Sequence, residues 1–113
     1  MSKNHILFAL LCSLSFTLNA QADYLDGQRA YANGDYEDAV IEWTPVAEDG
    51  DARAQYNLGW MSANGRGTNQ DFKEAVDWYT KSAKQGNVNA QYNLGNLYLR
   101  GQGASQNDKL AFS

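Results

Sequence analysis

The chain has 113 residues, with 13 Asp and Glu against 9 Lys and Arg and a formal net charge of −4. Its one His and its one Cys are His5 and Cys12, so residues 23–113 alone can form no disulfide, no His/Cys zinc site and no nucleophile activated by an imidazole. The acidic balance argues against nucleic acid or an anionic membrane surface as the partner.

The first 22 residues have the features of a secretory signal peptide. Lys3 precedes an apolar run at 6–18, and Ala-Gln-Ala at 20–22 is the small-x-small pattern that signal peptidase reads. A run of 13 residues is too short for a bilayer core, which needs about 20. Cys12 lies inside this run rather than at its end, which disfavours a lipid anchor. We therefore predict an exported, periplasmic protein whose mature chain begins at Asp23 and is not inserted in the membrane.

A repeat with a period of 36 residues organises the rest of the chain. The hexapeptide AQYNLG occurs at 54–59 and again at 90–95, within a stretch of 11 identities in 24 aligned positions. The same offset relates residues 35–50 to 71–86, with six identities in 16. A fixed period of this size indicates stacked repeats. We expect one repeat domain over 23–113, with units at 23–51, 52–87 and 88–113, the last of them incomplete.

Each unit is predicted to be a helical hairpin. In the second unit, one apolar helical face is formed at i, i+3, i+4, i+7 and i+11 by Phe72, Ala75, Val76, Tyr79 and Ala83. The first helices are expected near 23–33, 52–64 and 88–100. The second helices are expected near 36–49, 71–85 and 106–113.

Turn residues support these bounds. Asp71 and Asp35 are predicted N-caps of second helices, and Asp51 and Asn87 of the first helices that follow tight turns. The glycine pairs of the hairpin turns, 65/67 and 101/103, do not complete GxGxxG, and we interpret them as positions with positive φ rather than a phosphate loop.

Glycine and proline inside the predicted helices lead to two further structural predictions. Glycine costs about 1 kcal/mol against alanine inside a helix, so its recurrence at Gly27, Gly59 and Gly95 predicts close helix packing there. Pro45 lies inside a predicted helix and removes the hydrogen bond to the Ile41 carbonyl, so we expect a kink or break around 43–45.

The segment AQYNLGWMSANGRGTNQDFKEAVDWYTKSAKQGNVNAQYNLGNLYLRGQG, residues 54–103, resembles the Sel-one-like repeats (SLR), a branch of the tetratricopeptide-like (TPR) helical repeats. Residues 27–50 are similar to a plain tetratricopeptide unit with a shorter turn. The resemblance implies an all-α fold: a right-handed α/α solenoid of about two and a half repeats. It also implies an adaptor for protein–protein contacts. Some cysteine-rich exported relatives bind or hydrolyse β-lactams, but they pin each hairpin with a cysteine pair that residues 23–113 lack.

In the register of that family, the first helices line a concave groove. Aromatic rings and amides suit an extended peptide, because the rings cover its apolar side chains and the amides pair with its backbone. Arg100 could hold a carboxylate. Alternatively, Tyr56 and Tyr92 pack between helices, since both belong to the repeated hexapeptide. The candidate partner-binding residues are Tyr56, Trp60, Asn64, Tyr92, Asn96 and Arg100, with Tyr24, Gln28 and Tyr31 from the first unit.

No catalytic residue, cofactor or metal site is predicted. The adjacent acids at 37–38 and 48–49 fall on polar helix faces or helix ends, where they do not form the pair of carboxylates that a glycosidase needs. We therefore predict a non-catalytic interaction module that binds a protein or peptide of unknown identity. Two alternatives stay open: a small envelope hydrolase or β-lactam-binding protein, and a truncated remnant of a longer repeat array. The incomplete third unit favours a fragment of such an array.

Overall fold

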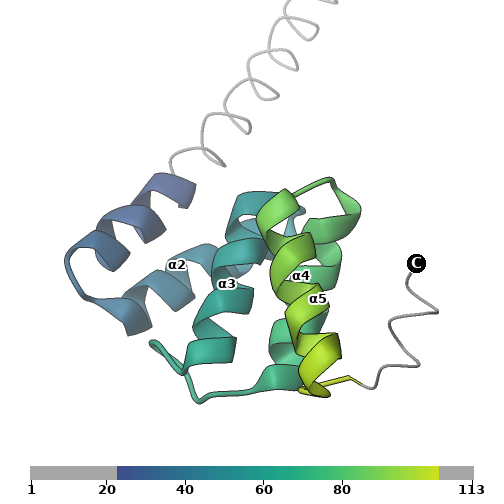
Figure 1. Ribbon diagram of the computed structural model, residues 1–113. Helices are drawn as coiled ribbons and strands as arrows, with labels where there is room; N and C mark the ends of the chain where they lie inside the picture. Colours follow the sequence, from purple (N-terminus) through teal and green to yellow (C-terminus); the bar gives the residue numbers. More distant parts are fainter. Residues whose placement is uncertain (1–22, 105–113) are drawn as a thin grey trace, which may run out of the picture.

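The part of the chain that the structure describes is entirely helical. The computed structural model describes residues 23–104. Residues 23–32 form an N-terminal helical segment, which is followed by α2 (Tyr36–Glu48), α3 (Ala52–Asn64), α4 (Phe72–Lys84) and α5 (Val88–Arg100) (Figure 1). These bounds lie within one residue of the predicted ones. The predicted signal peptide and the predicted helix at 106–113 lie outside the described residues.

The helices stack as consecutive hairpins. α3 packs on α2 before it and on α4 after it, while α5 packs mainly on α4 and touches α3 less (Figure 1). The N-terminal helical segment pairs with α2, because the indole nitrogen of Trp43 donates to the carbonyl oxygen of Tyr24 at 3.0 Å. The predicted α/α solenoid is therefore confirmed, and each helix pair depends on its neighbours for burial.

Side-chain caps start three of the helices as predicted. The carboxylate of Asp51 accepts from the backbone N–H groups of Arg53 and Ala54, that of Asp71 from Glu74, and the amide oxygen of Asn87 from Ala90. Asp35 is the N-cap residue of α2 as predicted, but its side chain makes no capping bond to the helix. Its backbone, at φ −85° and ψ 69°, departs from the extended conformation that aims an N-cap side chain at the free N–H groups.

Of the kink or break predicted around Pro45, no break occurs, since α2 runs without interruption to Glu48. Pro45 is exposed, and so is Ile41, which lies one turn earlier on the same side of the helix. The carbonyl that loses its donor therefore faces solvent and can bond to water, which lowers the cost. The opposite side carries Trp43, 3% exposed, and this buried indole anchors the helix.

Most residues of the repeated hexapeptide pack in the core or hold the turns between repeats. Its alanines and leucines, at 54, 58, 90 and 94, are all buried. Its glutamines close the turns between repeats: the amide of Gln55 donates to the carbonyl of Ala47 at 3.0 Å, and that of Gln91 donates to the carbonyl of Ala83 at 3.1 Å. Both bonds span eight residues, so the same side chain fastens the same turn in successive repeats.

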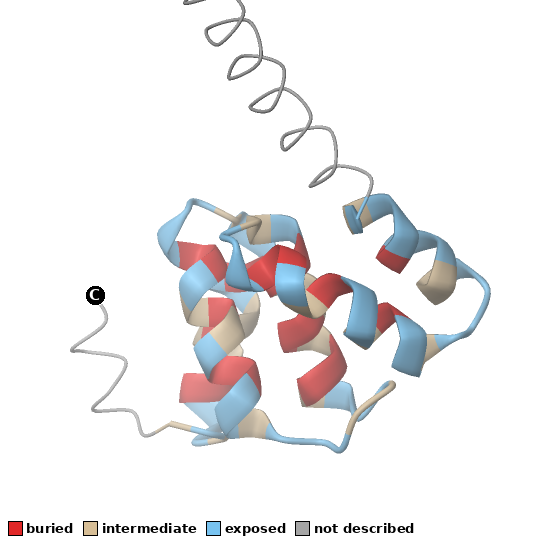
Figure 2. Cartoon of the chain, turned by 180° about the vertical axis from the view of Figure 1, so that it is seen from behind, coloured by how far each residue is buried: buried red, intermediate tan, exposed pale blue. Residues whose placement is uncertain are grey.

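The core consists of two clusters that lie between the helix layers (Figure 2). One joins buried residues of α2 and α3 and the other those of α4 and α5. Trp60, which is half-buried, packs against both clusters. Its indole therefore bridges the two halves of the core.

An aromatic ring lies directly over a helix glycine in both hairpins described. A Cβ on Gly59 would come within 2.7 Å of the Tyr79 ring, and one on Gly27 would overlap the indole of Trp43. The predicted packing role is thus confirmed for these two glycines. For Gly95 it is not tested, because the predicted partner helix at 106–113 lies outside the described residues; among those described, nothing lies within 4 Å of a Cβ placed there.

This contrast predicts opposite effects of the same substitution in the same hexapeptide. Gly59→Ala should lower the free energy of unfolding by about 1–3 kcal/mol, since the methyl group forces Tyr79 out of place. Gly95→Ala should leave it unchanged or raise it by up to about 1 kcal/mol through helix propensity. Urea unfolding followed by circular dichroism measures both. Equal destabilisation by the two variants would contradict the ring-over-glycine contact.

Candidate functional site

The first of two neighbouring hollows on the repeat surface is lined mainly by aromatic rings. This aromatic hollow has a volume of about 340 Å³. Its lining comes from the N-terminal helical segment, α2 and α3: Tyr24, Gln28, Tyr31, Trp43, Tyr56, Asn57 and Trp60. Residues far apart in the sequence thus converge because two successive first helices flank one second helix.

The rings of the aromatic hollow support one another. Trp43 lies 5.9 Å from both Tyr24 and Tyr31, measured between ring centroids, and Tyr31 makes an edge contact with Trp60 at 6.2 Å. Such pairs add about 0.5–1.5 kcal/mol each beyond the burial of their area. The buried Trp43 therefore forms the floor, and the half-buried tyrosines and Trp60 form walls with fixed orientations.

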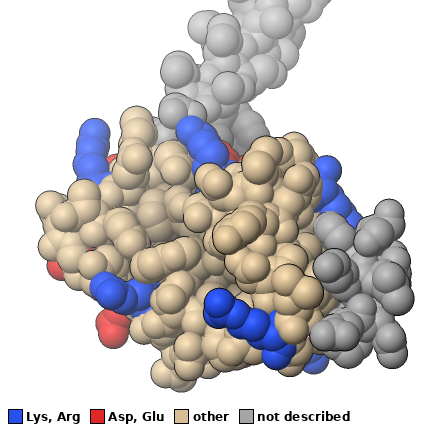
Figure 3. Space-filling view, viewed as in Figure 1, with Lys and Arg blue, Asp and Glu red and all other residues tan. Residues whose placement is uncertain are grey.

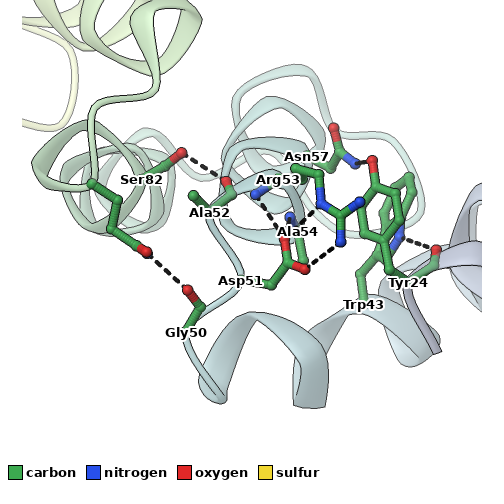
Figure 4. A network of polar contacts seen from close by, with 10 residues as sticks. Tyr24, Trp43, Gly50, Asp51, Ala52, Arg53, Ala54, Asn57 and Ser82 are labelled. Carbon is green, nitrogen blue, oxygen red and sulfur yellow. Dashed lines mark hydrogen bonds and ion pairs between the residues drawn. The ribbon is translucent and has the colours of Figure 1, made fainter. Parts of the chain in front are cut away.

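A polar network holds one wall of this hollow (Figure 4). Asp51 pairs with Arg53 at 2.7 Å, and the guanidinium of Arg53 lies 3.9 Å from the ring centroid of Tyr24. The amide of Asn57 donates to the Tyr24 hydroxyl at 3.4 Å. Burial alone would raise the pKa of Asp51, but the hydrogen bonds from Arg53 and Ala54 outweigh it and hold that pKa below its usual value. The hydrogen bond to Asp51 in turn raises the pKa of Arg53.

The second hollow is rich in amides. This amide hollow has a volume of about 200 Å³ and lies between α3, α4 and α5, with a lining of Trp60, Ala63, Asn64, Phe72, Tyr79, Asn93, Asn96, Leu97, Arg100 and Gln102. The amide of Asn93 donates to the Tyr79 hydroxyl at 3.3 Å. Burial raises the pKa of Tyr79 to about 12, so this hydroxyl stays protonated near neutral pH.

The two hollows are built from equivalent positions of successive repeats. Trp43 corresponds to Tyr79, Asn57 to Asn93 and Trp60 to Asn96, each 36 residues later. The positions therefore repeat while part of the chemistry changes: Tyr79 keeps a ring and Asn93 keeps an amide, but Asn96 places an amide where the first hollow has the indole of Trp60. Trp60 lines both hollows and makes them adjacent parts of one surface.

The structure brings together most of the predicted groove residues. Tyr24, Gln28, Tyr31 and Tyr56 line the aromatic hollow; Asn64, Asn96 and Arg100 line the amide hollow; and Trp60 lines both. Tyr92 lines neither and is 71% exposed, which corrects the prediction that it joins this groove. Tyr56 packs on the ring of Tyr79 with centroids 5.8 Å apart, so the inter-helix alternative holds for Tyr56, although it also lines a hollow.

Sequence reasoning missed Trp43, Asn57 and Asn93. Asn57 lies three residues before Trp60 and four after Arg53, on the same side of α3, so helical periodicity could have placed it in the groove. Trp43 lies on α2, the second helix of its hairpin. It lines the hollow only because α2 packs against the N-terminal helical segment. No pattern within α2 indicates this.

One face of the molecule shows few acidic side chains. The face seen in Figure 3 is mostly uncharged, with several Lys and Arg side chains and few acids. Arg100 is the charged side chain among those that line the two hollows. Its guanidinium makes no ion pair with another residue of the described part, 23–104. In that same part, no group of three or more His, Cys, Asp or Glu is placed to hold a metal ion.

Comparison with known proteins settles the family. The model of the Sel1 repeat matches residues 52–87 and 88–113. This chain belongs to the Sel1 repeat family. No curated protein gives a significant match to it.

Solved Sel1 repeat structures resemble this Sel1 repeat chain closely. A Sel1 repeat protein from Oxalobacter formigenes is 32% identical over 74% of this chain, with a TM-score of 0.67. A protective antigen present in uropathogenic Escherichia coli strains, which displays an SLR fold, is 33% identical over 80% of it, with a TM-score of 0.73. The matched regions are 33% and 20% of those two chains, so both relatives are much longer.

None of the helices within residues 23–104 combines the length and the apolar character that a bilayer span needs.

The network at Asp51 predicts a dependence of stability on pH. Because its pKa is lower in the folded state, the Asp51 carboxylate stabilises the protein above its unfolded pKa, about 3.9, and this contribution is lost as pH falls through the folded value. Asp51→Asn keeps an N-cap oxygen but removes the charge. The variant should be less stable than wild type at pH 6, and the difference should vanish near pH 2.

Thermal unfolding of both proteins across this range measures the effect. Asp26→Asn is the control, because its partner Arg29 lies 3.5 Å away and both side chains are largely exposed. A difference between wild type and Asp51→Asn that stays constant with pH would contradict the role of the ion pair.

Proposed function

We propose that this chain is an exported, non-catalytic interaction module that binds an extended segment of a partner protein across the two hollows. Sel1 repeat proteins are generally protein-interaction modules. The observation that carries the proposal is the continuity of the aromatic and amide hollows through the shared side chain of Trp60. A segment that crosses this indole would contact both hollows at once.

The chemistry of each hollow supports a peptide ligand. Aromatic walls around about 340 Å³ suit a bulky apolar side chain, because fixed rings offer a large contact area at low entropic cost. The smaller hollow supplies the amides of Asn64, Asn96 and Gln102, which can pair with backbone N–H and C=O groups. Arg100 at its margin adds a cation for a carboxylate of the partner.

The same lining supports a non-catalytic role. Apart from Arg100, the residues around the two hollows are aromatic, aliphatic or amide, so they include no carboxylate or imidazole for acid–base chemistry. Burial raises the pKa of the Tyr79 phenol to about 12, which is too high for a general base near neutral pH. A hydrolase would therefore need groups from outside this surface.

Export is part of the proposal and rests on residues 1–22. The apolar run and the Ala-Gln-Ala at 20–22 are typical of a cleaved signal peptide. Amino-terminal sequencing of the protein from the periplasmic fraction should give Asp23 as the first residue. An uncleaved chain in the cytoplasm would contradict export without bearing on the groove.

Site-specific photo-cross-linking in cells tests the groove. Benzoylphenylalanine at position 28 samples the aromatic hollow, and at position 64 the amide hollow; both native residues are exposed, so the probe should not disturb the fold. The matched control is position 41, which is exposed on α2 and lines neither hollow. We expect one discrete adduct of the same partner from positions 28 and 64 and none from position 41.

A second change tests the role of Arg100. Arg100→Gln should reduce the adduct from position 64 by about tenfold or more, the cost of losing a charged hydrogen bond. Arg66→Gln, which removes a cation from the turn after α3, should leave the yield unchanged, since Arg66 lines neither hollow. Adducts of equal yield from all three probe positions, or from none, would refute a groove that binds one partner.

A further inference from the structure

The two hollows lie one repeat apart, and this sets the distance between the contacts that a ligand makes. The aromatic hollow lies between the N-terminal helical segment and α3, and the amide hollow lies between α3 and α5. Because packed helices are separated by about 8–10 Å, equivalent contacts in the two hollows are about 9 Å apart.

Polyproline II is the extended backbone conformation that matches this step. It has three residues per turn and a rise of about 3.1 Å per residue, so side chains i and i+3 share one side and lie about 9 Å apart. On one side of a β-strand, side chains i and i+2 are about 7 Å apart and side chains i and i+4 about 13 Å. A polyproline II segment therefore meets equivalent positions of successive repeats in register, and a β-strand does not.

The aromatic hollow has the chemistry that binds proline. The rings of Tyr31 and Trp60 are inclined by 75° with centroids 6.2 Å apart, and the indole of Trp43 lies at the bottom of the same hollow. Grooves lined by aromatic rings bind proline-rich segments, because the flat pyrrolidine packs on the rings and the segment is already ordered before it binds.

Trp60 also offers a hydrogen-bond donor to the ligand. The indole nitrogen of Trp43 donates to the carbonyl of Tyr24, whereas that of Trp60 donates to no other group of residues 23–104. Every buried side-chain nitrogen and oxygen in that part of the chain has a partner, so the N–H of Trp60 faces solvent. An indole N–H can only donate, and a proline-rich segment presents carbonyl acceptors while its prolines have no N–H to satisfy.

Charge complementarity selects an acidic residue beside the prolines. Arg100 is the charged side chain in the lining of the two hollows, and it makes no ion pair within residues 23–104. It belongs to the amide hollow, one repeat from the rings. A carboxylate three residues from the bound proline would therefore face this guanidinium.

The groove side of a first helix stays open when the next second helix is in place. α4 packs on α3, yet neither α4 nor the turn that leads into it contributes to the lining of the aromatic hollow. The helix that completes a hairpin is therefore not what fills this hollow.

We propose that the partner segment is a proline-rich polyproline II helix that places a proline in the aromatic hollow and an acidic side chain, three residues away, at Arg100. This inference rests on the proposed function, because it names the ligand of the same groove. The indole N–H of Trp60, between the two contacts, donates to a backbone carbonyl of the segment.

Calorimetric titration of the purified protein with short peptides tests conformation and charge separately. The peptide EPPPPPE carries an acid three residues from its central proline on either side, so it fits in both chain directions. We expect saturable binding of EPPPPPE and about tenfold weaker binding of QPPPPPQ, which lacks the carboxylates. EGSFSGE keeps the acids and has a bulky apolar side chain on a flexible backbone, so it should bind more weakly than EPPPPPE.

Variants of the protein locate the two contacts. Arg100→Gln should bind EPPPPPE and QPPPPPQ equally. Trp60→Phe keeps a ring in the core but removes the N–H, and it should weaken EPPPPPE about fivefold. Trp78→Phe is the matched control and should leave the affinity unchanged, because Trp78 lines neither hollow. Circular dichroism should show the same helix content for all variants.

The outcomes separate this inference from the proposed function. Tighter binding of EGSFSGE than of EPPPPPE would overturn the polyproline II ligand and leave the groove in place. Absence of binding by the proline peptides would do the same if positions 28 and 64 still form an adduct with one partner, and would refute both proposals if they do not. Equal affinity of wild type, Arg100→Gln and Trp60→Phe for EPPPPPE would place the peptide outside the hollows.

Discussion

The contact of an aromatic ring with a helix glycine is the constraint on which the rest of the structure depends. Trp43 meets Gly27, and Tyr79 meets Gly59, so each hairpin closes until the ring lies on the backbone of its partner helix. This close approach buries the ring, aligns the next first helix and produces the hollow above it. A larger residue at either glycine would separate the helices and open the core.

The most repetitive residues maintain the scaffold, and the variable ones set its chemistry. In the hexapeptide, the alanine and leucine are buried and the glutamine fastens the turn between repeats. Variation begins directly after it, where Trp60 corresponds to Asn96 and Asn64 to Arg100. Because successive hairpins share a geometry, the first of these changes exchanges a ring for an amide and the second an amide for a cation at equivalent positions.

Trp60 contributes both to the packing of the core and to the surface of the groove. Its indole packs against both core clusters and lines both hollows. Truncating it would therefore lower stability as well as change the groove, since removal of a large packed side chain leaves a cavity. Exposed lining residues such as Gln28 and Asn64 separate these effects, because neither side chain is packed in the core.

The sequence by itself determined the repeat, the helix bounds and most of the groove residues, since periodicity, caps and glycine turns are local signals. It did not show that Asp35 makes no capping bond at the N-cap, or that α2 continues without a break through Pro45, because backbone dihedrals and solvent exposure decide those cases. Only the tertiary structure decided that Trp43 forms a floor, that Tyr92 lines neither hollow, and that Gly59 is covered by Tyr79 while no described residue covers Gly95. Identical hexapeptides differ in this way because burial depends on which helix lies opposite, and that helix comes from elsewhere in the chain.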